Sequence, residues 1–330
     1  MMKAIVYDRY GPPEVLRVED VERPVPGSKE VLVRVHAAVV SAADATFRAG
    51  RPLYSRLFTG LRGPKNRTLG CDLAGEVAEI GTDVTRFAVG DRVVADTGTA
   101  LGAHAEYVRL PEDGALAPAP SNLSHTEAAA VCDGLLTALP FLRDRAALRE
   151  GQEILVNGAS GGVGKAAVQL AAHFGARVTG VCSTPKLDLV KSMGADEVID
   201  YTAQDFTRTP RSYDVVFDAA GKSSFARCSR LLKPGGIYLT TVPSPAIFFH
   251  MFRPLKSNGR RAAIAFTGLR PARDRADDLR FLTELAEAGH LKPSIDTIHP
   301  PHRAAEAHHR AEAGQKKGTV LLTLAPDAAC

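Results

Sequence analysis

The sequence feature that most restricts the fold is a glycine-rich turn, NGASGGVG, at residues 157–164. An apolar run, EILV, precedes the turn, and a segment with helical periodicity, GKAAVQLAAHF, follows it. In such a strand–turn–helix unit the backbone can approach a pyrophosphate, and the start of the helix offers unpaired N–H groups. The turn therefore predicts dinucleotide binding. The residues expected to contact the cofactor here are Ser160, Gly161, Gly162, Val163 and Gly164.

Two other interpretations of this turn are a phosphate-binding loop of the GxxxxGK[ST] type and a tight turn that binds nothing. The phosphate-binding loop needs a glycine at position 159 and a hydroxyl residue at position 166, where the chain has Ala159 and Ala166. A turn without a ligand does not account for the strand–turn–helix–strand context. We therefore adopt dinucleotide binding as the interpretation.

Strand-like and helix-like segments alternate from residue 152 onwards. Apolar runs such as ARVTGV, YDVVF and GIYLTTV are separated by helical segments, among them PKLDLVKSMG and FARCSRLLKPGG. This alternation predicts a parallel sheet covered on both faces. The first hundred or so residues carry short strand-like runs separated by turns, which indicates a β-rich domain. The final strand, TVLLTL, lies far from the α/β unit, and we expect it to return to the first domain.

Two further segments have recognisable helix signals. In SHTEAAAV, Ser124 and Glu127 have the spacing of a capping box, which predicts a helix start at that point. The histidine-rich segment HPPHRAAEAHHRAEAG contains no HExxH motif, and one helical face cannot bring His302, His308 and His309 together. We interpret this segment as a solvated helix.

The end of the second strand of the α/β unit indicates the cofactor. NAD sites place an Asp or Glu there to accept hydrogen bonds from the ribose hydroxyls. In this chain the strand ends VTGVCSTPKLD, with no acid before Asp188. Ser183, Thr184 and Lys186 stand in its place and offer hydroxyl groups and a cation that suit a 2′-phosphate. The sequence therefore favours NADPH (NADP).

Composition narrows the class of protein. A chain of 330 residues is long enough for two domains, and its net charge of +4 is not clustered as in a nucleic-acid-binding protein. Five cysteines without close spacing indicate reduced thiols. The N-terminus has no signal-peptide pattern, and no long apolar run could span a bilayer. We expect a cytoplasmic protein that acts on a small molecule and binds neither nucleic acid nor membrane.

Motifs along nearly the whole chain resemble those of one family. They are MKAIVYDRYGPPEVL, LGCDLAGEVAEIG, FAVGDRVVA, LTAL at 136–139, NGASGGVGKAAVQLAAHFGA, MGADEVIDY, DVVFDAAG and LKPGG. Together they are similar to the medium-chain dehydrogenase/reductase superfamily, in its zinc-independent, quinone oxidoreductase-like branch. The resemblance implies an α/β protein with a GroES-like β-barrel catalytic domain, residues 1–122 and 269–330. An inserted Rossmann domain with a doubly wound parallel sheet, residues 123–268, would bind NADP(H). It also implies an active site in the cleft and an assembly that is a homodimer or a tetramer, of which we expect the homodimer.

The same resemblance assigns further cofactor contacts. Lys186 and Tyr201, the latter in VIDY, are expected at the adenosine 2′-phosphate. Lys317, or its neighbour Lys316, is a further candidate for this phosphate. The remaining expected cofactor contacts are Thr137, Ala220 and Phe266.

Zinc-dependent alcohol dehydrogenases of the superfamily hold a catalytic zinc with three side chains. The matching positions here are Ser41, Cys71 and Asp133. A serine hydroxyl is a weak zinc ligand compared with a thiolate or imidazole. The four-cysteine lobe of those enzymes is also missing, because residues 93–111 contain no cysteine. We therefore expect no metal and interpret Cys71 as a small buried thiol.

The substrate site departs from the family pattern. Quinone oxidoreductases of this type often carry Asn-x-x-Asp-x-Tyr where this chain has Ser41, Asp44 and Thr46. The missing tyrosine implies a wider and more polar substrate site. The resemblance places Asp133 near the nicotinamide, where a hydrophobic cleft would raise its pKa and make it a proton donor. The alternative is that Asp133 is a hydrogen-bonding carboxylate at a helix end.

These features predict an enzyme that reduces quinones or α,β-unsaturated carbonyls with NADPH. A conjugated acceptor spreads the incoming charge onto a remote oxygen, which needs only a donor such as the Thr46 hydroxyl. A simple ketone, in contrast, is harder to polarise without a Lewis acid. Two alternatives are a zinc-dependent alcohol dehydrogenase with atypical ligands and a non-catalytic NADPH-binding protein.

Overall fold

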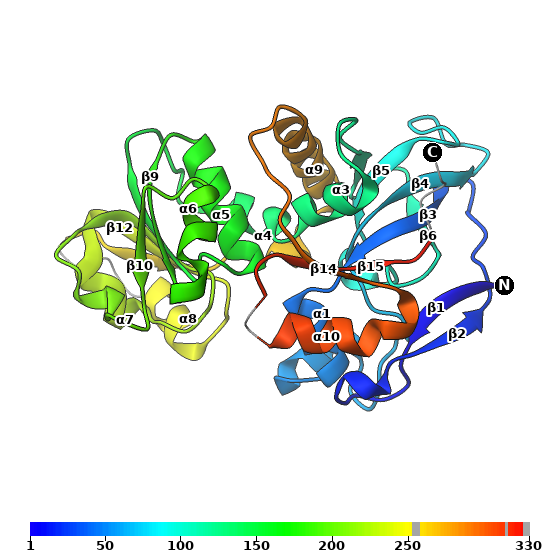
Figure 1. Cartoon of the computed structure of the whole chain (residues 1–330), viewed down its shortest axis with the longest axis horizontal. Coiled ribbons are helices and arrows are strands. Elements are labelled where there is room, and N and C mark those ends of the chain that lie inside the picture. Colours follow the sequence, from blue (N-terminus) through cyan, green and yellow to red (C-terminus); the bar gives the residue numbers. More distant parts are fainter. Residues whose placement is uncertain (253–257, 314–315, 326–330) are drawn as a thin grey trace. The chain divides into compact units, whose positions relative to one another are not determined.

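The computed structural model describes residues 1–252, 258–313 and 316–325 (Figure 1). The chain forms two compact units, one of Met1–Asp133 with Gly268–Cys330 and the other of Gly134–Thr267. The predicted first boundary lay at residue 122. Helix α3 (His125–Cys132) instead belongs to the first unit, because it packs against four strands of that unit.

The second unit is built on a parallel sheet. Its strands are β8 (Glu153–Asn157), β9 (Arg177–Cys182), β10 (Glu197–Asp200), β11 (Tyr213–Asp218), β12 (Leu232–Thr240) and β13 (Arg261–Ala263). They lie in the order β10-β9-β8-β11-β12-β13, and all neighbours are parallel. This is the strand order of a dinucleotide-binding sheet, with its topological switch point between β8 and β11. The predicted parallel sheet is therefore confirmed.

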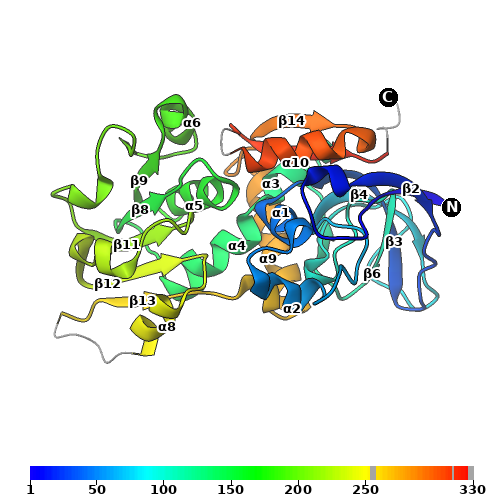
Figure 2. The same ribbon diagram turned by 90° about the horizontal axis from the view of Figure 1, so that it is seen from below.

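Helices pack against this sheet from both halves of the unit. The described helices of this unit are α4 (Leu135–Leu139), which packs on α5, and α5 (Gly162–His173), α6 (Leu187–Ser192), α7 (Phe225–Cys228) and α8 (Pro245–Phe252). Helices α5 and α6 contact β8, β9 and β10, whereas α7 contacts β12 and α8 contacts β13 (Figures 1 and 2). The helix predicted for FARCSRLLKPGG is too long. Helix α7 ends at Cys228 and β12 begins at Leu232, since Pro234 and the two glycines after it do not sustain a helix.

The first unit is β-rich, as predicted. Strands β1 (Met2–Val6) and β2 (Arg17–Val21) form an antiparallel pair. A larger sheet contains β3 (Glu30–Val39), β4 (Asp72–Ile80), β5 (Arg92–Asp96), β6 (Tyr107–Pro111), β7 (Leu116–Pro118), β14 (Ile295–His299) and β15 (Thr319–Thr323). Its order is β14-β15-β3-β4-β5-β7, with β6 paired to β3. Because β15 pairs with β3, the C-terminal strand returns to the first unit, as predicted.

The described helices of this unit are α1 (Ala42–Ala49), α2 (Arg56–Thr59), α3, α9 (Ala272–Glu287) and α10 (Ala304–Glu312). Two of them, α1 and α3, begin with a capping box, whereas the other three have no side-chain cap. The predicted capping box of Ser124 and Glu127 is present at the start of α3. None of the helices in the described part of the chain has the length and hydrophobicity that crossing a bilayer requires.

The histidine-rich segment forms α10, but the prediction that this helix is solvated is wrong for one of its faces. His308 is fully buried, and its Nδ1 accepts a hydrogen bond from Arg48 Nη1 at 3.0 Å. Arg48 also forms an ion pair with Glu312, with 2.6 Å between Nη1 and Oε1. Burial lowers the pKa of His308 to about 2, so the imidazole stays neutral and can accept this hydrogen bond. The contact joins α10 to α1.

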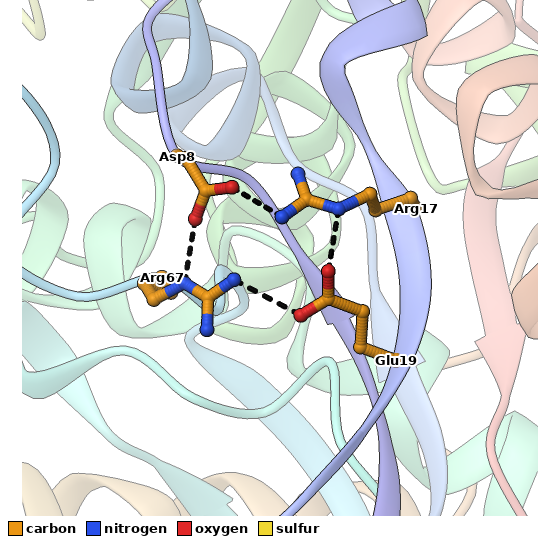
Figure 3. Close-up of polar contacts among 4 residues, drawn as sticks. All are labelled: Asp8, Arg17, Glu19 and Arg67. Carbon is orange, nitrogen blue, oxygen red and sulfur yellow. Dashed lines mark hydrogen bonds and ion pairs between the residues drawn. The ribbon is translucent and has the colours of Figure 1, made fainter.

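A ring of four charged side chains joins the β1–β2 pair to the segment before β4 (Figure 3). Asp8 pairs with Arg17 and with Arg67, whose Nε lies 2.6 Å from Asp8 Oδ1. Glu19 pairs with the same two arginines, with 2.6 Å between Arg17 Nε and Glu19 Oε1. These hydrogen bonds lower the pKa values of Asp8 and Glu19. The side chains are exposed, so salt screens the ring and its contribution to stability is small.

Candidate functional site

The turn between β8 and α5 forms a cradle that only glycine permits at two positions. Gly158 has a φ of +81°, and a Cβ there would lie 2.7 Å from the Cβ of Ala220. A Cβ at Gly164 would lie 2.0 Å from the carbonyl oxygen of Gly158. At Gly161, in contrast, the nearest atom to a Cβ would be 3.4 Å away. Packing therefore explains Gly158 and Gly164, while the space beside Gly161 leaves its backbone open to a ligand.

The start of α5 has the properties of an anion site. Gly161 is its N-cap and provides no side-chain acceptor, so the N–H groups of the first turn have no partner within the helix. The helix dipole adds a partial positive charge at this end. The turn also follows β8, beside the switch point where doubly wound sheets bind ligands. The cradle therefore fits the pyrophosphate of a dinucleotide.

A buried carboxylate, that of Asp218, holds the residue that precedes this turn. Asp218, the last residue of β11, is fully buried. Its Oδ1 accepts a hydrogen bond from Asn157 Nδ2 at 2.8 Å, and its Oδ2 accepts bonds from Ser223 N at 2.7 Å and Tyr238 Oη at 3.0 Å. Asn157 is the last residue of β8 and directly precedes Gly158. Asp218 therefore joins the ends of β8 and β11 to β12 at the point where the turn begins.

The loop after β9 lies beside an acid that the sequence did not reveal. Asp200, the last residue of β10, accepts a hydrogen bond from the Thr184 hydroxyl at Oδ2. Its Oδ1 accepts bonds from Thr202 N at 2.8 Å and Thr202 Oγ1 at 2.6 Å. Thr184 was expected to donate to a phosphate, but its hydroxyl hydrogen points to Asp200. Ser183 is half-buried, and Lys186, the expected cation, is buried at 8% exposure.

The other expected cofactor residues of the second unit differ in exposure. Tyr201 is 57% exposed and follows Asp200. Thr137 is half-buried on α4, and Ala220 is exposed just after β11. Phe266 is half-exposed, and its ring stacks on that of Phe248 with 6.3 Å between centroids. The backbone places Ala220 beside the glycine cradle, whereas Thr137 and Phe266 lie on separate elements of the unit.

Lys316 and Lys317, near the C-terminus, belong to the first unit, whereas the cofactor residues described above belong to the second. Lys317 is exposed, and its backbone N–H donates to Asp296 Oδ1 at 2.7 Å. Lys316 is half-buried, and its charge helps to lower the pKa of Asp296, after the larger effects of hydrogen bonds from Arg310 and Lys317.

In the first unit, two of the expected substrate residues form a helix cap. Ser41 is the N-cap of α1, and its N–H and hydroxyl both donate to Asp44 Oδ2, at 2.8 and 2.6 Å. Asp44 is fully buried, and its Oδ1 accepts a hydrogen bond from Gly70 N at 2.9 Å. These contacts give Ser41 and Asp44 a structural role. Thr46 lies on α1, two residues after Asp44. It is half-buried and is not part of the cap.

Beside this cap lies a group of acidic residues around Cys71. The Cys71 thiol donates a hydrogen bond to the carbonyl of Gly98 at 3.4 Å, and burial together with Asp44, Asp96 and Asp72 raises its pKa. Asp72 and Asp96 are cross-strand neighbours on β4 and β5. Asp96 forms an ion pair with Arg275 at 2.6 Å. Burial and the neighbouring carboxylates raise the pKa of Asp72 well above its usual range.

Asp133 follows α3 as its C-cap and is buried. Its Oδ2 accepts a hydrogen bond from Thr319 Oγ1 at 2.8 Å. Cys132, directly before it, is buried, and burial together with nearby carboxylates raises the pKa of its thiol. Of the two interpretations of Asp133, the geometry favours the hydrogen-bonding carboxylate at a helix end.

The three positions that match zinc ligands do not suit zinc. The Ser41 hydroxyl is engaged by Asp44, and the Asp133 carboxylate is engaged by Thr319. Zinc binds cysteine as a thiolate, whereas the surroundings of Cys71 favour the neutral thiol. Within residues 1–252, 258–313 and 316–325, no group of three or more His, Cys, Asp and Glu side chains is arranged to hold a metal ion.

Sequence reasoning missed Asp218 and Asp200. Both follow an apolar strand, in YDVVFD and EVID, and carboxyl ends of parallel strands meet at the ligand-binding edge of such sheets. The position of each acid at the end of an apolar strand was the signal in the sequence that could have identified them. That signal could not show which loops the two carboxylates would join.

Comparison with known proteins extends over nearly the whole chain. Residues 27–121 match a family described as "Alcohol dehydrogenase GroES-like domain", and residues 193–322 match one described as "Zinc-binding dehydrogenase". The first match agrees with the predicted GroES-like fold of the β-rich unit.

Individual relatives are named as reductases. The chain is 34% identical to a 2-methylene-furan-3-one reductase of Solanum lycopersicum, over 97% of this chain and 79% of the relative. It is also 34% identical to a chloroplastic NADPH-dependent alkenal/one oxidoreductase of Arabidopsis thaliana, with the same coverage. The structure of a quinone oxidoreductase from Coxiella burnetii has a TM-score of 0.84 and 28% identity, over 98% of this chain and 99% of that one.

Proposed function

The chain belongs to the medium-chain dehydrogenase/reductase superfamily, in its quinone oxidoreductase-like branch, and from this premise we propose that it reduces quinones or α,β-unsaturated carbonyl compounds with NADPH and without zinc. The observation that carries the proposal is the glycine cradle at the start of α5, whose close approaches at Gly158 and Gly164 leave the backbone at Gly161 open. The names of the relatives support the class of acceptor.

The cofactor supplies a hydride, and the protein supplies binding, orientation and a proton donor. The N–H groups at the start of α5, from Gly162 to Gly164, would hold the pyrophosphate. Ser183 and Tyr201, at the ends of β9 and β10, would face the adenosine ribose and any phosphate on it. The absence of an acid at the end of β9 and the name of the Arabidopsis relative support NADPH over NADH.

A conjugated acceptor suits the residues of the first unit. Hydride adds to the electron-poor carbon or ring, and negative charge develops on an oxygen that one hydrogen bond can stabilise. A proton from the group that donates this hydrogen bond, or from water, then completes the reduction. Because the donor set at Ser41, Cys71 and Asp133 does not suit zinc, no Lewis acid is assigned to this step.

One assay with purified protein tests the proposal. We expect oxidation of NADPH in the presence of quinones and enones, with at least tenfold lower rates for simple aldehydes and alcohols. Incubation with a chelator is expected to leave the rate unchanged, and metal analysis of the same sample is expected to find less than one zinc per ten chains. Chelator-sensitive alcohol oxidation would establish a zinc alcohol dehydrogenase instead. Tight NADPH binding without turnover on any acceptor would establish a non-catalytic binding protein.

Thr46 is the proposed donor to the substrate oxygen, and its variant tests that role. Thr46→Val keeps the shape of the side chain and removes the hydroxyl, so we expect kcat with an enone to fall about tenfold. The dissociation constant for NADPH should stay within a factor of two, because α1 lies in the other unit from the glycine cradle. Asp44→Asn provides the contrast. It should lower the melting temperature, since it breaks the buried α1 cap. Unchanged kcat in Thr46→Val would remove Thr46 from the mechanism.

The cellular setting is part of the same proposal. We propose a cytoplasmic homodimer, in line with the family resemblance. The four described cysteines, Cys71, Cys132, Cys182 and Cys228, are free thiols, which supports a reducing compartment. Light scattering coupled to size-exclusion chromatography would give the mass of the assembly, and a monomer would contradict the dimer.

A further inference from the structure

The edge formed by β9 and β10 carries a negative charge where these two parallel strands end, at Asp200. Asp200 and Cys182 end these two strands and lie opposite each other in the parallel register. The Tyr201 N–H donates to the Cys182 carbonyl at 3.1 Å, which holds the two following loops together. Parallel strands end at the same edge, and this edge is where doubly wound sheets meet the adenosine ribose.

Hydrogen bonds keep Asp200 ionised in this place. Thr184 donates to one carboxylate oxygen, and the N–H and hydroxyl of Thr202 donate to the other. Together these bonds lower the pKa of Asp200. Asp200 lies 16 positions after Thr184 in the sequence. The acid is therefore the last residue of the neighbouring strand β10 and not a residue at the end of β9.

The Asp200 carboxylate lies where a ligand can reach it. Its hydrogen bonds from Thr184 and Thr202 are exposed to solvent, and the Thr184 N–H adds a further, smaller interaction. From the solvent side the carboxylate can accept a ribose 2′-hydroxyl, as the acid of NAD sites does. A 2′-phosphate in the same position would instead meet a like charge, and the Thr184 hydroxyl could not donate to it because its hydrogen is directed to Asp200.

Resting on the proposed function, we infer that Asp200 narrows the preference for NADPH over NADH: it accepts the 2′-hydroxyl of NADH and repels the 2′-phosphate of NADPH. Binding of NADPH then depends on Ser183, Lys186 and Tyr201 overcoming this repulsion. The protein therefore binds NADPH more weakly than it would without the negative charge of Asp200.

Replacement of the charge gives the test. In Asp200→Asn, the amide oxygen can still accept from Thr202 while the negative charge is gone. We expect the dissociation constant for NADPH to fall about three- to tenfold, as one charge acting over several ångströms near solvent predicts. The dissociation constant for NADH should rise about threefold, so the ratio of the two constants shifts by about tenfold or more. Isothermal titration calorimetry with each nucleotide measures binding without turnover.

Asp188→Asn is the matched control. Asp188 is an exposed carboxylate on α6, close to the same loop in sequence but not on the strand edge. It should change the ratio by less than twofold. The inference would be overturned if Asp200→Asn left the ratio within a factor of two of wild type, or if Asp188→Asn shifted it equally. Wild-type protein that bound neither nucleotide would overturn the proposed function itself, which is a separate and visible outcome.

Discussion

Replacing Gly164 with alanine is expected to abolish cofactor binding, with a loss of at least a hundredfold in affinity. The new Cβ would lie 2.0 Å from the Gly158 carbonyl oxygen and 2.8 Å from its carbon. Both are backbone atoms of the same turn, so the clash can be relieved only by opening the cradle. Such overpacking costs about 1–3 kcal/mol of stability and moves the N–H groups that face the ligand. Calorimetry with NADPH and thermal unfolding measure the two effects.

Gly161→Ala separates the packing of the turn from its contact with the ligand. A Cβ at this position would make an ordinary contact of 3.4 Å, and the φ of −77° is open to alanine. We expect a melting temperature within about 2 °C of wild type and an affinity for NADPH about tenfold lower, because the methyl group occupies space that the pyrophosphate needs. If Gly161→Ala bound NADPH as tightly as wild type, the ligand would not approach the backbone at this point.

The second large effect is expected at Asp218, where Asp218→Asn should lower both stability and cofactor affinity. Three donors converge on this buried carboxylate, from Asn157, Ser223 and Tyr238. An amide has one oxygen, so at least one donor would face an NH₂ group. Leaving a buried donor unsatisfied costs about 1–3 kcal/mol. Because Asn157 directly precedes Gly158, the same change should weaken NADPH binding about tenfold.

Tyr238→Phe is the control for this prediction. It removes one of the three donors but keeps the carboxylate and its bond to Asn157. The variant should lose about 1 kcal/mol of stability and keep its affinity for NADPH within a factor of two. An equal loss of affinity in both variants would mean that Asp218 acts only through general stability. The KM for the quinone should not change in either variant, since Thr46, the proposed donor to the substrate, lies in the first unit.

Local patterns in the sequence predicted much of this protein. The alternation of apolar runs and amphipathic segments predicted the parallel sheet, and the glycine-rich stretch at residues 157–164 predicted the turn that joins β8 to α5. The spacing of Ser124 and Glu127 predicted the start of α3. Each of these signals depends on residues a few positions apart, where backbone geometry fixes which side chains are neighbours.

Predictions that depended on distant partners fared less well. Thr184 was expected to donate to a phosphate, and it donates to Asp200 of the next strand. Lys186 was expected to face the adenosine 2′-phosphate, and its side chain is buried at 8% exposure. His308 was expected in solvent and accepts a hydrogen bond from Arg48, which is 260 positions away. In each case the residue type was compatible with several surroundings.

The sequence by itself determined the architecture of the chain, its glycine cradle and its family. The tertiary structure alone decided which charges meet at the candidate site. Asp218 closes a bond with Asn157 across 61 positions because β8 and β11 are neighbours in the sheet. Asp200 reaches the loop after β9 because β10 lies beside that strand. Periodicity depends on local backbone geometry and can be found along the chain, whereas a hydrogen-bond partner is chosen by strand order, which is set only when distant segments pack together.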